Sequence, residues 1–148
     1  MNHLLLVGLC HSLDLVGGST VKLGRALRQT WAKWSGFEAS TLTLGAHEVH
    51  HWVGGSGPTL LLIHGFGAGG LPTWLPVARH LSKTHRVIIP DLLWFGSSTS
   101  LASPSLDAQA EAIQLLVEHL ASPEERVDIV GSSYGGFVAL RYGSLVPE

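Results

Sequence analysis

The sequence of 148 residues predicts an α/β fold in which a mostly parallel sheet is flanked by helices. The main observation is a set of three short, mainly apolar runs, at Thr59–Ile63, 86–89 and 127–130, of which the first is continuous. Such runs are typical of strands that are buried on both faces. Helical patterns separate them, and strands that alternate with helices predict a parallel sheet.

The predicted strands and helices follow one another from residue 37 onward. We therefore divide the chain into an N-terminal extension (1–36) and a core (37–148). Residues 41–44 and 48–53 predict two strands around a turn at Gly45 and Ala46. Helices are expected at 71–83, after a glycine-rich turn, and at 105–121, where Ser105 is a candidate N-cap and Pro123 follows the end. The last helix is expected at 134–146.

Composition excludes several classes of protein. Hydrophobic residues make up 45% and charged residues 14%, which is incompatible with a disordered chain. The net charge of −2 predicts no binding to nucleic acid. The one cysteine, Cys10, excludes a disulfide framework, and the nine histidines show no metal-binding spacing. We therefore expect neither a metal nor an organic cofactor.

The extension contains one amphipathic pattern. Leu23, Leu27, Trp31 and Trp34 fall on one face of a helix predicted over 20–34, with basic residues mostly off that face. The expected role is packing on the protein body, and the alternative is a weak contact with a membrane surface. The apolar run at 4–10 is far shorter than the roughly 20 residues of a membrane span. No basic residue precedes it, so no signal peptide is predicted and a cytoplasmic location is expected.

A candidate nucleophile follows the third apolar run. Residues 131–135 read Gly-Ser-Ser-Tyr-Gly, a G-x-S-x-G motif between a predicted strand and a predicted helix. The small residues Gly131 and Gly135 allow strand and helix to approach closely, so that Ser133 stands on a sharp turn at the end of the sheet. The N-terminus of the following helix favours negative charge there.

Two more motifs follow the other apolar runs. His64, Gly65, Phe66 and Gly67 come directly after Thr59–Ile63, and 90–98 reads Pro-Asp-Leu-Leu-Trp-Phe-Gly-Ser-Ser. With the serine motif, these resemble the HG-x-G turn, the D-x-x-G-x-G-x-S loop and the nucleophile elbow of the α/β-hydrolase superfamily. The similarity is greatest to its esterase and carbon–carbon-bond hydrolase branches, and it covers about residues 42–148.

The resemblance implies a role for each matching residue. Ser133 is the expected nucleophile, and the backbone N–H groups of Phe66 and Tyr134 are the expected oxyanion hole. His64 resembles a structural histidine and Asp91 a residue that orients its loop. Supporting roles are expected for Gly65, Gly67, Gly131 and Gly135. Trp94 departs from the family, which often has glycine there.

The family places an acid and then a histidine after its serine. The fifteen residues after Ser133 contain neither histidine nor aspartate, and their only acid is Glu148. We therefore expect these residues to be the N-terminal part of a hydrolase of esters or similar carbonyl compounds, inactive alone and prone to self-association. The alternative is that His64 or another upstream histidine acts as the base.

Two other functions stay open. Residues 65–70 match G-x-G-x-x-G after a strand, and Asp91 lies 21 residues further on, which is the pattern of a dinucleotide-binding oxidoreductase. Against it, Pro72 and residues 69–72 delay the helix that should meet the pyrophosphate. The third hypothesis is a hydrolase-fold module that binds a ligand without catalysis.

Overall fold

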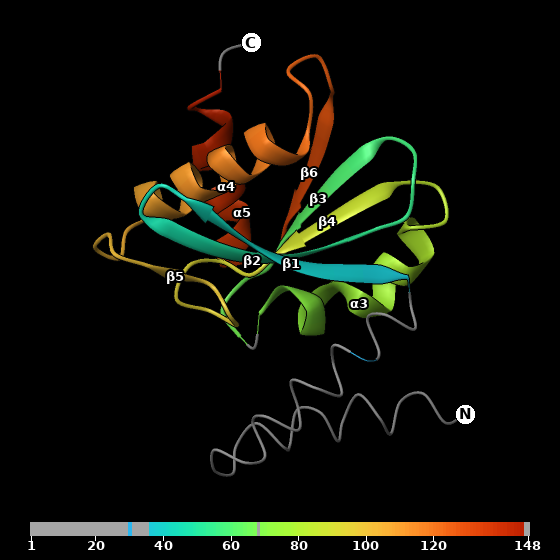
Figure 1. Cartoon of the computed structure of the whole chain (residues 1–148), viewed down its shortest axis with the longest axis horizontal. Coiled ribbons are helices and arrows are strands. Elements are labelled where there is room, and N and C mark those ends of the chain that lie inside the picture. The colour runs from blue at the N-terminus through green and yellow to red at the C-terminus, as the bar shows by residue number, and fades with distance from the viewer. Residues whose placement is uncertain (1–29, 31–35, 68, 147–148) are drawn as a thin grey trace.

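The computed structural model describes residues 30, 36–67 and 69–146, which form a layered α/β structure (Figure 1). The elements are β1 (Phe37–Leu44), β2 (His47–Gly54), β3 (Thr59–Ile63), α3 (Gly70–Leu81), β4 (Arg86–Pro90), β5 (Thr99–Ser100), α4 (Leu106–Leu120), β6 (Val127–Gly131) and α5 (Tyr134–Gly143). The alternation predicted from Thr59 onward is confirmed.

The sheet has the strand order β1-β2-β4-β3-β6, and β5 pairs with β2 beside this path. Strands β4, β3 and β6 run parallel, whereas the β1–β2 hairpin and β5 add antiparallel strands. The fold is therefore the predicted α/β architecture with an antiparallel side. The order also shows where the site lies, because the carboxyl ends of parallel strands meet at one edge of the sheet.

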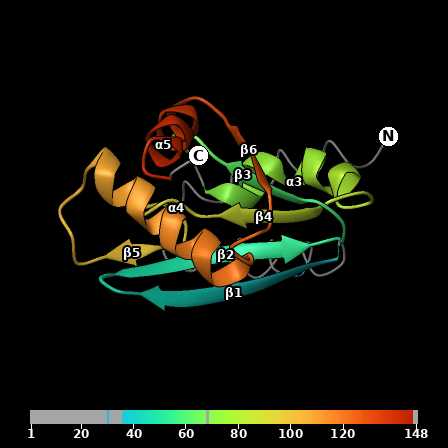
Figure 2. The ribbon, with the colours of Figure 1, turned by 90° about the horizontal axis from the view of Figure 1, so that it is seen from above.

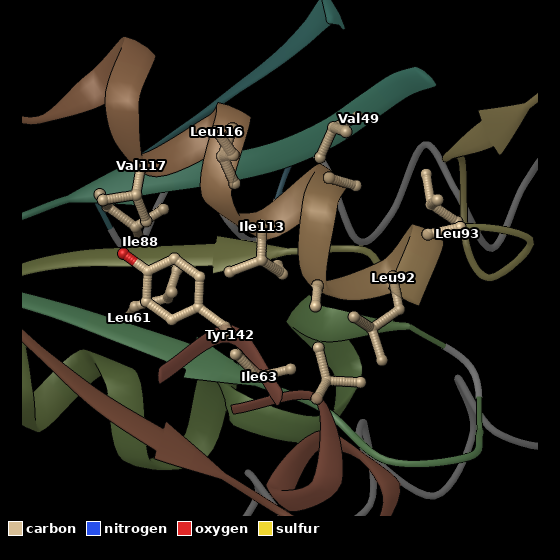
Figure 3. Packing of buried hydrophobic residues seen from close by; sticks show 14 residues of the cluster. Val49, Leu61, Ile63, Ile88, Leu92, Leu93, Ile113, Leu116, Val117 and Tyr142 are labelled. Carbon is tan, nitrogen blue, oxygen red and sulfur yellow. The ribbon is translucent and has the colours of Figure 1, made fainter. Parts of the chain in front are cut away.

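Helices cover both faces of the sheet. Helices α4 and α5 lie on one face and α3 on the other, as the view from above shows (Figure 2). On the first face, Leu61, Ile63 and Ile88 pack against Ile113 and Leu116 of α4 (Figure 3). On the second face, Leu60, Leu62 and Ile89 pack against Leu71 and Leu75 of α3. Because β3 supplies residues to both clusters, its continuous apolar sequence is explained.

The two longest helices start in different ways. The hydroxyl of Ser105 accepts a hydrogen bond from the N–H of Ala108, which confirms the predicted N-cap of α4. Helix α3 has no such cap from its own sequence. Its first N–H, that of Gly70, donates instead to the carboxylate of Asp91, 21 residues further along the chain. The start of α3 therefore depends on the loop after β4.

Several boundaries differ from the sequence prediction. Strand β1 starts four residues before the expected residue 41, while α5 ends at Gly143 rather than 146. The two-residue strand β5 was not predicted. The amphipathic helix predicted over 20–34 lies outside the described residues, apart from Thr30. None of the helices in the described part of the chain is long and apolar enough to cross a membrane.

Candidate active site

Ser133 lies at the sharp turn between β6 and α5. Its backbone has φ 52° and ψ −120°, a conformation that residues other than glycine rarely adopt. Such conformations cost of the order of 1–3 kcal/mol and persist only where the surrounding structure enforces them. The side chain of Ser133 makes no capping hydrogen bond to α5, and the residue is exposed. The turn therefore presents the hydroxyl at the carboxyl edge of the sheet.

Close backbone contacts enforce this turn. A Cβ placed on Gly131 would overlap the carbonyl of Gly135, and one placed on Gly135 would overlap the carbonyl oxygens of Ile63 and His64. The N–H of Ser132 donates to the Ile63 carbonyl at 2.9 Å, which ties the turn to the end of β3. At both glycines of the G-x-S-x-G motif, packing therefore leaves no room for a side chain.

The loop after β3 lies directly against the serine. A Cβ on Gly65 would be 2.9 Å from both Ser133 Cβ and the Ser132 carbonyl oxygen. This contact brings the next peptide N–H, that of Phe66, to the same edge of the sheet. The N–H of Tyr134 begins α5 and has no acceptor within the helix. Gly67 has φ 155°, and nothing lies within 4 Å of a Cβ placed there, so its role is conformational.

His64 is buried and both of its ring nitrogens are engaged. The N–H of Leu92 donates to Nε2 at 2.9 Å, so Nδ1 carries the proton and donates to the carbonyl of Gly65 at 2.6 Å. Burial lowers the pKa of His64, and the Gly65 carbonyl and the charge of Asp91 only partly oppose this effect. His64 is therefore neutral and structural, and it has no free nitrogen to accept a proton from Ser133.

Asp91 joins the loops after β3 and β4. Its Oδ1 accepts from the N–H of Gly70 at 2.7 Å and its Oδ2 from the N–H of Ser97 at 2.9 Å. Gly69 and Gly96 have positive φ, and a Cβ on either would contact the carboxylate. A ribose-binding acid needs an accessible oxygen, whereas Asp91 is 2% exposed and holds two backbone N–H groups. This geometry does not favour the dinucleotide-binding hypothesis.

Two further side chains hold these loops in positions that the sequence did not predict. Gln109 of α4 accepts from the N–H of Leu93 at 2.9 Å and donates to its carbonyl at 3.0 Å. Ser98 accepts from the N–H of His50 and donates to the carbonyl of Asp91. Gln109 was detectable in principle, because it is a polar residue on the apolar face of a predicted helix. Ser98 occupies the final position of the D-x-x-G-x-G-x-S motif, so the sequence singled out its loop but assigned no role to its side chain.

A connected set of aromatic rings lies on the residues next to Ser133 and on the loop after β4. The ring of Phe66 stacks on that of Tyr134, with centroids 4.7 Å apart, and its edge contacts Phe95 at 5.6 Å. Phe95 in turn contacts His64 at 5.5 Å. Trp94 has φ 66°, so the position at which this sequence departs from glycine is one where the backbone itself favours glycine.

Comparisons with known proteins agree with this arrangement. A family model described as alpha/beta hydrolase fold matches residues 58–148. An uncharacterized protein of Mycobacterium tuberculosis is 41% identical over 112 residues, which cover 72% of this chain and 32% of that protein. The 2-hydroxymuconate semialdehyde hydrolase of a Pseudomonas species is 39% identical over 101 residues, covering 64% of this chain and 34% of the relative.

Among solved structures, a bacterial membrane phospholipase A has a TM-score of 0.71 at 28% identity. The match covers 95% of this chain and 45% of the phospholipase chain. The chain thus spans about a third of the length of the curated relatives it matches.

The two adjacent glycines at the start of α5 provide a matched test of the turn. We expect Gly135→Ala to lower the free energy of unfolding by about 1–3 kcal/mol, because the new methyl group overlaps the end of β3. Gly136→Ala should raise it by roughly 0.5–1 kcal/mol, since a Cβ there meets nothing closer than 3.7 Å and alanine favours helix. Urea unfolding of both variants measures the difference. Equal effects would contradict the packing described here.

The neutral state of His64 predicts a loss of stability in mild acid. The unfolded chain takes up a proton below the ordinary histidine pKa of about 6.5, but the folded chain does not, because burial lowers the pKa of His64. The contribution of His64 to the free energy of unfolding should therefore be constant above about pH 6.5. Below that pH the free energy of unfolding should decrease, by up to about 1.4 kcal/mol per pH unit for this residue. Denaturant unfolding between pH 7.5 and 5.5 measures this slope, and His64→Gln should reduce it. An unchanged slope in the variant would be inconsistent with a neutral His64.

Proposed function

Because the chain belongs to the α/β-hydrolase fold family, we propose that it carries the nucleophile and oxyanion hole of a serine hydrolase. The substrate is an ester or a similar carbonyl compound, attacked by Ser133. The observation that carries this proposal is the backbone of Ser133, at φ 52°, against which Gly65 is packed. A non-glycine residue with this strain at the mouth of a site favours function over a purely structural turn.

In the proposed reaction, Ser133 Oγ bonds to the carbonyl carbon and its proton passes to a base. The carbonyl π electrons move onto oxygen, where the N–H groups of Phe66 and Tyr134 stabilise the charge. Collapse of this intermediate expels the alcohol, which takes up the proton, and leaves an acyl group on Ser133. Water then releases the acid by the same two steps. Each oxyanion donor typically contributes roughly 2.7–4 kcal/mol to the stability of the transition state.

The base and its acid are proposed to come from outside these 148 residues. No histidine or aspartate follows Ser133 in the sequence, and His64 has both ring nitrogens bound to backbone groups. The relatives are about three times longer than the matched region, which is consistent with additional residues in the complete site. An engaged His64 also disfavours the alternative in which this histidine serves as the base.

The test is covalent labelling of Ser133 by an alkyl fluorophosphonate, followed by mass spectrometry. We expect slow modification at Ser133 that added imidazole accelerates, because imidazole supplies the missing base. Ser133→Ala should abolish labelling, whereas Ser132→Ala, at the adjacent serine, should retain it. Ester turnover without added base should be poor, although an oxyanion hole alone can give ~10³–10⁴-fold catalysis over water.

Two outcomes would overturn parts of the proposal. Labelling at other residues, or labelling that persists in Ser133→Ala, would contradict the nucleophile and favour a module that only binds a ligand. Robust ester turnover without imidazole that is lost in Ser133→Ala would contradict an external base.

A further inference from the structure

Phe66 is an exposed aromatic residue at the mouth of the site. Its side chain is on the surface, with 75% of the residue exposed, although the residue follows a buried strand and Gly65, where an added Cβ would lie 2.9 Å from Ser133 Cβ. Large apolar side chains are normally exposed only singly or where something binds. The backbone N–H of Phe66 is a proposed oxyanion donor. The ring of the same residue would therefore lie near the carbonyl group of a bound substrate.

The ring is held in place without being covered. One face stacks on Tyr134 at an interplanar angle of 28°, and the ring edge meets Phe95 at 62°. Phe95 is itself packed edge-on against the buried His64. These three contacts fix the orientation of Phe66 in advance, so a ligand would lose little entropy in ordering it.

The segments that contain the ring, its aromatic partners and Ser133 carry little charge. In the described segments 64–67, 91–97 and 132–134, Asp91 is the only residue with a formal charge, and it is buried and bound to backbone N–H groups. The guanidinium of Arg141, further along α5, pairs with Asp107 at 2.6 Å. Nothing in these segments offers a counter-charge to an anionic ligand.

We infer that the Phe66 ring, backed by Tyr134 and Phe95, binds an uncharged aromatic group of the substrate beside the scissile carbonyl. The inference rests on the proposed function and narrows its substrate class to aryl-bearing esters. A stacked or edge-on ring is the arrangement that the exposed face of Phe66 favours, because aromatic pairs gain stability beyond the area they bury.

The experiment measures binding in the Ser133→Ala protein, so that no turnover interferes. The probes are methyl phenylacetate and benzyl acetate, isomers that carry the ring on the acyl or the alcohol side, and ethyl acetate, which has no ring. Amide chemical shifts of residues 65–67 and Tyr134 report the dissociation constant. We expect at least one isomer to bind about tenfold more tightly than ethyl acetate, and the tighter isomer identifies the side that carries the ring.

Variants separate the ring from the rest of the surface. Phe66→Ala should abolish the advantage of the aromatic ester, and Phe66→Leu should retain only part of it. Leu101→Ala is the matched control, because Leu101 is also an exposed apolar residue, at 94%, but lies outside the aromatic cluster. The Leu101→Ala variant should bind all three esters as tightly as the Ser133→Ala protein without this further change. Thermal melting checks that each variant is folded, which is expected because neither side chain belongs to the core.

Equal binding of the three esters, or an unchanged preference in Phe66→Ala, would overturn the inference. Preferential binding of an aromatic ester, combined with no fluorophosphonate labelling of Ser133 in the unchanged chain, would instead contradict the proposed function alone. Normal labelling of Ser133 without selective binding would contradict only the role of Phe66.

Discussion

The strained backbone of Ser133 is the constraint on which the rest of the site depends. Ser133 keeps φ 52° because the close contacts of the turn with the end of β3 and the start of α5 exclude other backbone conformations. These contacts require glycine at positions 131 and 135 of the turn and at position 65 opposite, since a Cβ at any of them would overlap its neighbours. The same contacts place the first N–H of α5 and the loop after β3 beside the hydroxyl. One steric requirement thus positions the proposed nucleophile and both proposed oxyanion donors.

Buried polar groups hold the loops around this turn without exposing charge to the site. Asp91 holds the start of α3 and its own loop through two backbone N–H groups, and Gln109 holds Leu93 of the same loop from α4. His64 bridges the loops after β3 and β4 as a neutral ring. Each of these polar side chains satisfies backbone groups that burial would otherwise leave unpaired, which is costly in a protein interior. The exposed ring of Phe66 and the partly buried ring of Tyr134 then lie next to Ser133.

Much of this arrangement could be predicted from the sequence, for identifiable reasons. Strand β3 was predicted with its observed bounds because a strand covered on both faces is apolar throughout. The glycines around Ser133 and Asp91 were informative because close backbone approach allows no other residue. Strand β5 could not be predicted, since two residues carry no periodicity. The role of Gln109 depends on which loop meets α4, and that of Ser98 on which strand its loop meets. Both are tertiary properties. The engagement of His64 likewise became evident only from its two backbone partners.

In the proposed site, the turn aims Ser133 Oγ at a point shared by the N–H groups of Phe66 and Tyr134. The most direct measurement is a crystal structure of the chain with an alkyl boronic acid, whose tetrahedral adduct imitates the proposed intermediate. We expect a bond from boron to Ser133 Oγ, with one boronate oxygen about 2.7–3.1 Å from both N–H groups. An adduct on another residue, or a boronate oxygen directed away from both N–H groups, would contradict it.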